Sequence, residues 1–213
     1  MNINTANSLL FVTAGLTPFI VYLGLGPDGA AILDQARAEQ FFAYLFFSLP
    51  IAILMARRIE KNYFIDGGLI IIVASMSMAM AADAFRAAAN LSDVANAIAV
   101  TAYSSTILGV SISGIGIFRT NIFPKWLSGL LTLVTAIGFI LLATSEPSAI
   151  QTSFVILPFL LAFHVILIVL GVLMFKRYDK NWVCFLNPKR SLVFIIIYYL
   201  IAINPLKNEK VGY

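Results

Sequence analysis

Long runs of apolar residues, separated by short polar stretches, dominate the pattern of this chain. Each run is close to the roughly 20 residues that a helix needs to cross the hydrocarbon core of a bilayer. Lipid offers no hydrogen bonds, so a spanning segment must satisfy its own backbone, and a helix does this. The pattern predicts six spanning helices, at about residues 8–25, 41–56, 67–90, 95–118, 127–144 and 153–175.

The alternative to helices in a membrane is a β-barrel, whose strands alternate apolar and polar positions. The run LIIIVASMSMAMAA in the third segment does not alternate in this way. Composition agrees, because 61% of the residues are hydrophobic and only 11% are charged, whereas soluble domains carry about 25% charged residues. We therefore predict an all-α fold, a polytopic transmembrane helical bundle.

The basic residues stand almost entirely in the polar stretches that flank the apolar runs. Arg57 and Arg58 follow the second run, Arg119 and Lys125 follow the fourth, and Lys176 follows the sixth. The stretches between them are acidic or near neutral, so basic and non-basic loops alternate. By the positive-inside rule this predicts a multi-pass protein of the plasma (inner) membrane with its N-terminus in the cytoplasm. The formal net charge of +4 then needs no nucleic-acid partner.

The end of the chain differs from the rest. We expect a six-helix transmembrane domain over residues 1–187 and an apolar segment with a basic tail over 188–213. The run at 191–204 would rise only about 21 Å as a helix, which is short of the roughly 30 Å hydrocarbon core. It is predicted to be an interfacial or re-entrant segment, with a short seventh span as the alternative, and it is a candidate for docking a membrane-protein partner.

Two charged residues stand near the end of the third apolar run. Asp83 and Arg86 are three positions apart, so they share a helix face and can pair, which lowers the cost of placing either charge at membrane depth. One interpretation is a ligand or ion site that opens to the outer side. The other is an ion pair that fixes the end of the helix.

His164 is the only histidine and lies near the middle of the sixth run. A single histidine does not make a metal site. It is a candidate for a ligand contact or a proton relay, and the simpler interpretation is a neutral imidazole hydrogen-bonded inside the bundle.

The fourth run is the most polar. Ser104 and Ser111 are candidates for lining a polar cavity. Ser105, Gly109 and Ser113 are spaced by four residues, which predicts a flat stripe on which another helix backbone packs closely.

Motifs for other chemistry are missing from the sequence. It contains no HExxH, no GxSxG, no phosphate-binding glycine loop and no CxxC pair. We accordingly predict no catalytic residues, no metal site and no cofactor.

One stretch resembles a known family. The turn FRTNIFPKWLSG (118–129), followed by an apolar span, a loop and a span with Pro158 that ends GVLMFKR, resembles the C-terminal half of a bacterial family of six-helix membrane proteins of unknown function. The resemblance covers about residues 117–176 and implies only a topology. That family usually has an acidic residue close to where His164 stands, and it lacks the apolar tail.

Three functional hypotheses follow from these features. The first is an integral membrane protein in contact with the lipid bilayer that acts as a small carrier or as an accessory subunit of a membrane complex. The second is a membrane-embedded enzyme acting on a lipid or quinone, which requires His164 and Asp83 within hydrogen-bond reach. The third is a pigment-binding or photoreceptor-like protein, which rests only on the helix count and one histidine.

Overall fold

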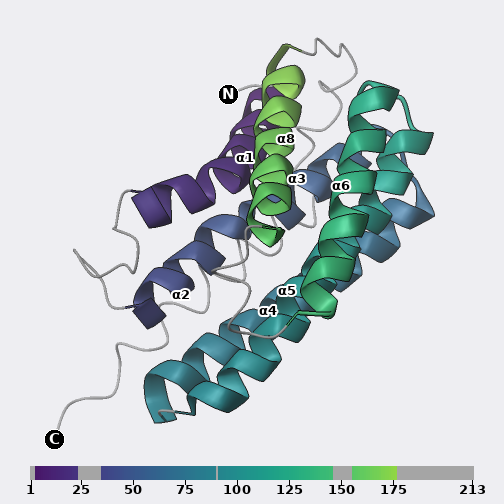
Figure 1. Cartoon of the computed structure of the whole chain (residues 1–213). Coiled ribbons are helices and arrows are strands. Elements are labelled where there is room, and N and C mark those ends of the chain that lie inside the picture. The colour runs from purple at the N-terminus through teal and green to yellow at the C-terminus, as the bar shows by residue number, and fades with distance from the viewer. Residues whose placement is uncertain (1–2, 24–34, 90, 146–154, 177–213) are drawn as a thin grey trace, which may run out of the picture. The chain divides into compact units, whose positions relative to one another are not determined.

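The computed structural model of the chain describes residues 3–23, 35–89, 91–145 and 155–176 (Figure 1). These residues form helices and no strand. The helices are α1 (Ile3–Pro18), α2 (Gln35–Phe46), α3 (Ser48–Arg57), α4 (Tyr63–Ala89), α5 (Ser92–Arg119), α6 (Lys125–Ala143) and α8 (Ile156–Lys176), with a π-helical turn at Phe19–Leu23 after α1.

The described residues contain six helical segments that are long and apolar enough to cross a membrane, with α2 and α3 together supplying one of them. They fit a multi-pass integral membrane protein, so the predicted all-α fold with six spans is confirmed. The predicted seventh segment at 191–204, and the predicted division of the chain at residue 187, lie outside the described residues.

Proline explains the two irregular points. Pro18 has no N–H to donate to the carbonyl of Ala14, and the regular helix changes there into the wider turn Phe19–Leu23. Pro50 likewise cannot bond to the carbonyl of Phe46, which is where α2 ends. Pro158 lies in the first turn of α8, where its missing N–H costs no helical hydrogen bond.

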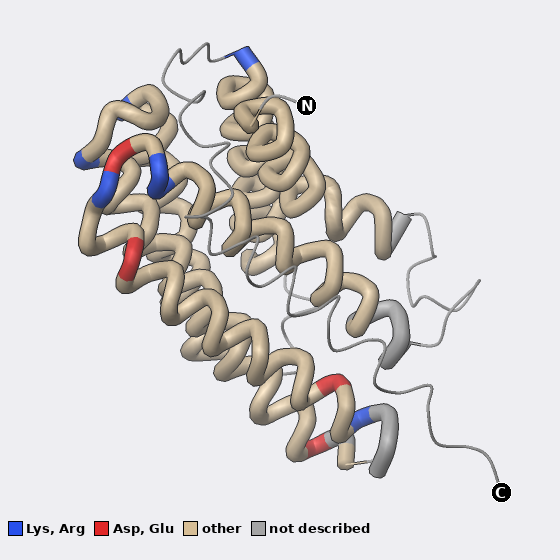
Figure 2. The backbone as a smooth tube through the Cα atoms, turned by 180° about the vertical axis from the view of Figure 1, so that it is seen from behind, with Lys and Arg blue, Asp and Glu red and all other residues tan. Residues whose placement is uncertain are grey.

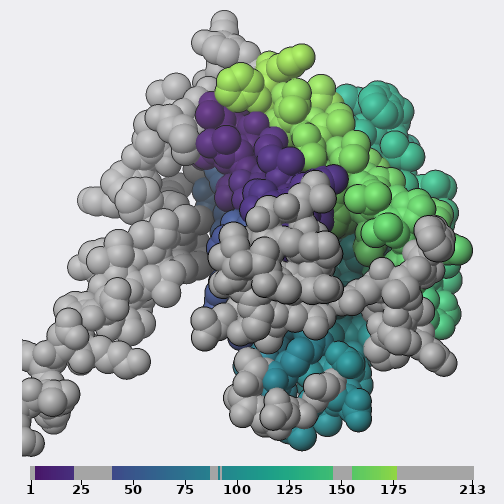
Figure 3. Space-filling model, turned by 60° about the vertical axis from the view of Figure 1, so that its left-hand side comes forward, coloured from purple at the N-terminus to yellow at the C-terminus, as the bar shows by residue number. Residues whose placement is uncertain are grey.

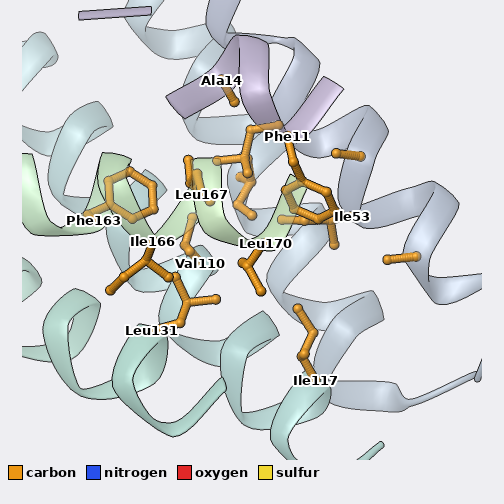
Figure 4. Close-up of a cluster of buried hydrophobic side chains, with 14 of the residues drawn as sticks. Phe11, Ala14, Ile53, Val110, Ile117, Leu131, Phe163, Ile166, Leu167 and Leu170 are labelled. Carbon is orange, nitrogen blue, oxygen red and sulfur yellow. The ribbon is translucent and has the colours of Figure 1, made fainter. Parts of the chain in front are cut away.

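The helices are arranged around two closely packed antiparallel pairs. α5 packs against α4 and against α6, while α8 packs against α1, which also contacts α3. α1 and α8 lie side by side although they stand at opposite ends of the described chain (Figures 1 and 3). A shared core joins the two groups through Phe11, Ile53, Val110, Leu131, Phe163, Leu167 and Leu170 (Figure 4).

Glycine allows the close approach within both pairs. A Cβ atom on Gly109 would lie 2.8 Å from the carbonyl oxygen of Gly68, and a Cβ on Gly15 would lie 2.7 Å from that of His164. Both distances are below van der Waals contact, so any side chain would force the backbones apart. Small residues of this kind are the usual means by which helices associate in lipid, where burial of apolar surface gives little drive.

The basic turns lie at one end of the bundle. The turn between α3 and α4 meets the turn between α5 and α6, where the backbone N–H of Asn121 donates to the Glu60 carboxylate at 2.9 Å. Figure 2 shows Lys and Arg gathered mainly at this end. We call it the basic end and the opposite one the far end.

Candidate functional site

Asp83 lies near the C-terminal end of α4, at the far end of the bundle. Its side chain is 1% exposed, and the nearest oxygen is 3.6 Å from Nη1 of Arg86. Arg86 in turn donates from Nη2 to Oδ1 of Asn96 on α5, at 2.8 Å. The three residues therefore form a chain of polar contacts that connects the two helices.

The carboxylate of Asp83 is incompletely satisfied. Neither of its oxygens accepts a hydrogen bond from any residue that the structure describes, because 3.6 Å is too long for one. A buried carboxylate normally accepts several hydrogen bonds. Asp83 thus combines a short-range attraction to Arg86 with unused acceptor capacity.

Ser104 and Ser111 lie elsewhere. Both are buried, at 6% and 5% exposure. The hydroxyl of Ser104 donates to the carbonyl of Thr101 in its own helix at 3.1 Å, and that of Ser111 donates to the carbonyl of Thr132 on α6 at 3.3 Å. In this arrangement the two hydroxyls serve contacts within α5 and between α5 and α6.

His164 sits in an aromatic cluster. The ring is 6% exposed, and its centroid lies 4.9 Å from that of Phe163, 5.8 Å from that of Phe46 and 6.5 Å from that of Phe42. Nδ1 lies 2.7 Å from the carbonyl oxygen of Leu160, to which it donates as the protonated nitrogen. Nε2 is then an acceptor, and it has no hydrogen-bond partner among the described residues.

Asp83 and His164, the two residues that the enzyme hypothesis requires, form no direct hydrogen bond with each other in the described part of the chain. Asp83 packs in the α4–α5 pair, whereas His164 contacts phenylalanines of α2 and α8. The Asp83 oxygens and Nε2 of His164 are all without a hydrogen bond in the described part of the chain, so no direct hydrogen bond links them. The enzyme hypothesis, which requires the two side chains within hydrogen-bond reach directly or through one water, stays a prediction.

The small residues of α5 meet α4. Gly109 lies against Gly68 and Ile72, and a Cβ placed on Gly68 would lie 2.6 Å from the backbone nitrogen of Ser113. Ser113 is fully buried, and its hydroxyl has no hydrogen-bond partner among the described residues. Ser105, the third residue of the predicted stripe, is half-buried.

Two polar residues were not anticipated from the sequence. Asn96 completes the Asp83–Arg86 chain from the other helix. Asn7 on α1 is 1% exposed, and neither polar atom of its amide has a hydrogen-bond partner within the described segments. Asn7 precedes the predicted first span, because the apolar run only becomes continuous at residue 8.

No group of three or more His, Cys, Asp or Glu side chains that could hold a metal ion occurs among the described residues.

Comparison with other proteins adds no relative, since none of the family models, curated proteins or solved structures searched matches the chain. The resemblance noted for residues 117–176 stays a prediction.

Proposed function

We propose that this integral membrane protein is an accessory subunit of a larger membrane complex, and that the exposed face of α4 packs against its partner. The observation that carries the proposal is the character of that face. Ala74, Ser77, Ala81 and Ala84 are all exposed, and their spacing of three, four and three residues places them in one stripe along α4. We call these four residues the α4 stripe.

The exposed faces of α6 and α8 differ from the α4 stripe. α6 exposes Leu130, Leu133 and Ile140, and α8 exposes Leu161 and Val165. Large apolar side chains of this kind suit contact with lipid tails. Small side chains suit another helix, because they let two backbones approach closely. Large exposed side chains adjoin the α4 stripe. Ile70 lies one turn before Ala74 at 70% exposure, and Val73, Met78 and Phe85 lie beside the stripe at 43%, 42% and 44% exposure. These would pack around the edge of such a contact.

The candidate polar groups support a structural role over a transport role. Asp83, Ser104 and Ser111 are all buried, and two of them donate hydrogen bonds to backbone carbonyls of the bundle. A carrier requires such groups on a water-accessible path. A subunit requires only that they hold the helices in place.

The direct test is gentle extraction followed by size-resolved mass analysis. We expect the wild-type chain to travel with a stoichiometric protein partner. Ala81→Trp should abolish this association because the indole ring would hold the two backbones apart, whereas Leu133→Trp on the lipid-suited face of α6 should retain it. Recovery of the wild-type chain as a lone monomer, or full retention of the partner by Ala81→Trp, would contradict the proposal.

The C-terminal segment is a second route to the same partner. Residues 188–213 lie outside the described residues, so their part in docking rests on their apolar run and basic flanks alone. Truncation after Asn187 separates the two routes. Loss of the partner only on truncation would assign docking to the segment and remove the α4 stripe from the account.

We also propose that the membrane is the plasma (inner) membrane and that the N-terminus is cytoplasmic. The support is the gathering of Lys and Arg at the basic end (Figure 2), which the positive-inside rule places in the cytoplasm. Topology reporters fused to the α3–α4 turn and to the α4–α5 connection test this. An external signal from the α3–α4 turn would reverse the orientation.

A carrier is the second candidate, and one observation favours it. The unmet acceptors of Asp83 are what a cation or a hydrogen-bonding solute would use, and an ionisable residue inside a membrane often marks such a path. In this case Asp83→Asn would abolish solute flux in proteoliposomes without loss of folded protein. Unchanged flux in that variant would leave Asp83 a structural residue.

A further inference from the structure

A depression at the basic end combines an apolar wall with a polar rim. Its volume is about 460 Å³. It is lined by Asn121, Ile122, Phe123 and Pro124 of the α5–α6 turn, by Lys125 of α6 and by Leu173 of α8. Lys125 begins α6, and α8 ends at Lys176, three residues after Leu173. The depression therefore lies where the helices leave the apolar layer.

The turn that forms the wall is firmly anchored. The ring of Phe123 is 5% exposed and meets Phe11 of α1 edge to face, with 5.8 Å between centroids. On the other side, the backbone N–H of Asn121 is held by the Glu60 carboxylate. Core packing and a hydrogen bond thus fix the shape of the wall before any ligand arrives.

Lys125 places a positive charge at the rim. Its ammonium group donates to the carbonyl oxygens of Phe118 at 2.7 Å and of Thr120 at 2.8 Å, which satisfies the end of α5. An ammonium group has three N–H donors, so one N–H has no hydrogen bond to these carbonyls, and the group also lies 5.8 Å from the centroid of the Phe118 ring. No carboxylate in the described part of the chain pairs with Lys125. By contrast, the charge of Arg57 is matched by Asp66.

From these features we propose that the depression binds an anionic phospholipid. The headgroup phosphate would accept a hydrogen bond from Lys125 beside Asn121, and an acyl chain would lie along Leu173. Basic pockets between helices on the cytoplasmic side are suited to anionic headgroups because the phosphate gains both the charge and a fixed donor. This lipid site is independent of the α4 stripe, which belongs to another helix.

The test uses the full chain in nanodiscs that contain equal amounts of phosphatidylglycerol and phosphatidylcholine. The protein is released in mild detergent, and native mass spectrometry counts the lipid retained. We expect preferential retention of one phosphatidylglycerol. Lys125→Gln should lower that retention about fivefold, the loss expected for one basic residue at a membrane surface. Lys61→Gln removes the same charge at the same end, outside the depression, and should leave it nearly unchanged.

A second pair of variants tests the shape of the site and leaves its charge intact. Leu173→Trp should fill the depression and release the lipid, whereas Val172→Trp, on the adjacent exposed position of α8, should not. This pair decides the matter if Lys125→Gln fails to fold, because it leaves the bonds of Lys125 to α5 untouched.

Several results would overturn the proposal. Equal losses in Lys125→Gln and Lys61→Gln would mean that only the general charge of the basic end attracts lipid. Equal losses in Leu173→Trp and Val172→Trp would show that the depression is not the site, and so would an absence of preference for phosphatidylglycerol. Competition by soluble glycerol 3-phosphate as effective as that by short-chain phosphatidylglycerol would assign the site to a free phosphate.

Discussion

The α4–α5 pair and the α1–α8 pair use the same means of contact but treat their polar groups differently. Both bring two backbones together over glycine, at Gly68 and Gly109 in the first pair and at Gly15 and Gly171 in the second. In the α4–α5 pair, the guanidinium group of Arg86 donates a hydrogen bond to Asn96 on the neighbouring helix. Next to the α1–α8 contact, Asn7 and Nε2 of His164 have no hydrogen-bond partner within the described segments.

This difference separates two contributions to helix association, which are close backbone packing and polar contacts. In the α1–α8 pair, the described contact is close backbone packing over Gly15 and Gly171. The charges of the α4–α5 pair are therefore an addition to a contact that glycine already provides. Each prediction below tests one part of this comparison, beginning with the largest expected effect.

Gly68→Ala should weaken the α4–α5 contact most. The added Cβ would lie 2.6 Å from the backbone nitrogen of Ser113, so the helices must move apart. We expect a loss of about 3 kcal/mol in the free energy of unfolding, measured by denaturant titration in mixed micelles. Gly67→Ala is the matched control, because a Cβ there meets nothing within 4 Å. Similar losses in the two variants would show that the contact is not where the structure places it.

Gly15→Ala should weaken the α1–α8 contact by a smaller amount. Its Cβ would lie 2.7 Å from the carbonyl oxygen of His164, but the closest atom is a side-chain carbon of Ile168 that can move. A loss of about 2 kcal/mol is expected in the same assay. Gly138→Ala, whose Cβ would make an ordinary contact at 3.6 Å, should change little. If Gly15→Ala is as stable as this control, close packing does not hold the pair.

Arg86→Gln should cost about 1 to 2 kcal/mol, between the values for exposed and for buried ion pairs. The loss arises because Asp83 stays buried without its counter-charge. Asp83→Asn together with Arg86→Gln should restore part of the stability, and a double-mutant cycle measures the coupling between the two residues. Additive effects would mean that the pair contributes nothing to holding α4 and α5 together.

His164→Phe should have the smallest effect, within about 1 kcal/mol of the wild-type chain. Among the described residues, the imidazole hydrogen-bonds only to Leu160 of its own helix, and phenylalanine fits the surrounding aromatic cluster. Thermal unfolding of the purified protein measures the change. A large loss of stability would indicate that Nε2 has a partner, such as a bound ligand, in the native protein.

Local patterns in the sequence were sufficient to predict the membrane-spanning segments and one contact of the candidate site, that between Asp83 and Arg86. Run length and loop charge predicted six membrane-spanning helices, and the three-residue spacing of Asp83 and Arg86 predicted a shared face. Asn96 could not be predicted as the third member, since it comes from another helix. Which backbone lies against Gly109 could not be predicted either, because every helix of the bundle was an equal candidate.

The residues at which helices begin and end were harder to predict than the number of spans. The second span was predicted as one helix over 41–56, whereas the structure ends α2 at Phe46 and begins α3 at Ser48. A proline marks where a hydrogen bond is lost, but neighbouring helices decide whether the span then kinks or continues. Asn7 illustrates the same limit, because its burial depends on α1 beginning at Ile3 and packing against α8.

The central claim, that the α4 stripe packs against a partner, is tested most directly inside the native membrane. A photocrosslinking amino acid is placed at Ala81 of α4 or, as the control, at Leu133 of α6, and the products are resolved by mass. The account predicts one discrete protein adduct from Ala81 and only lipid adducts from Leu133. Lipid adducts alone from both positions would contradict it.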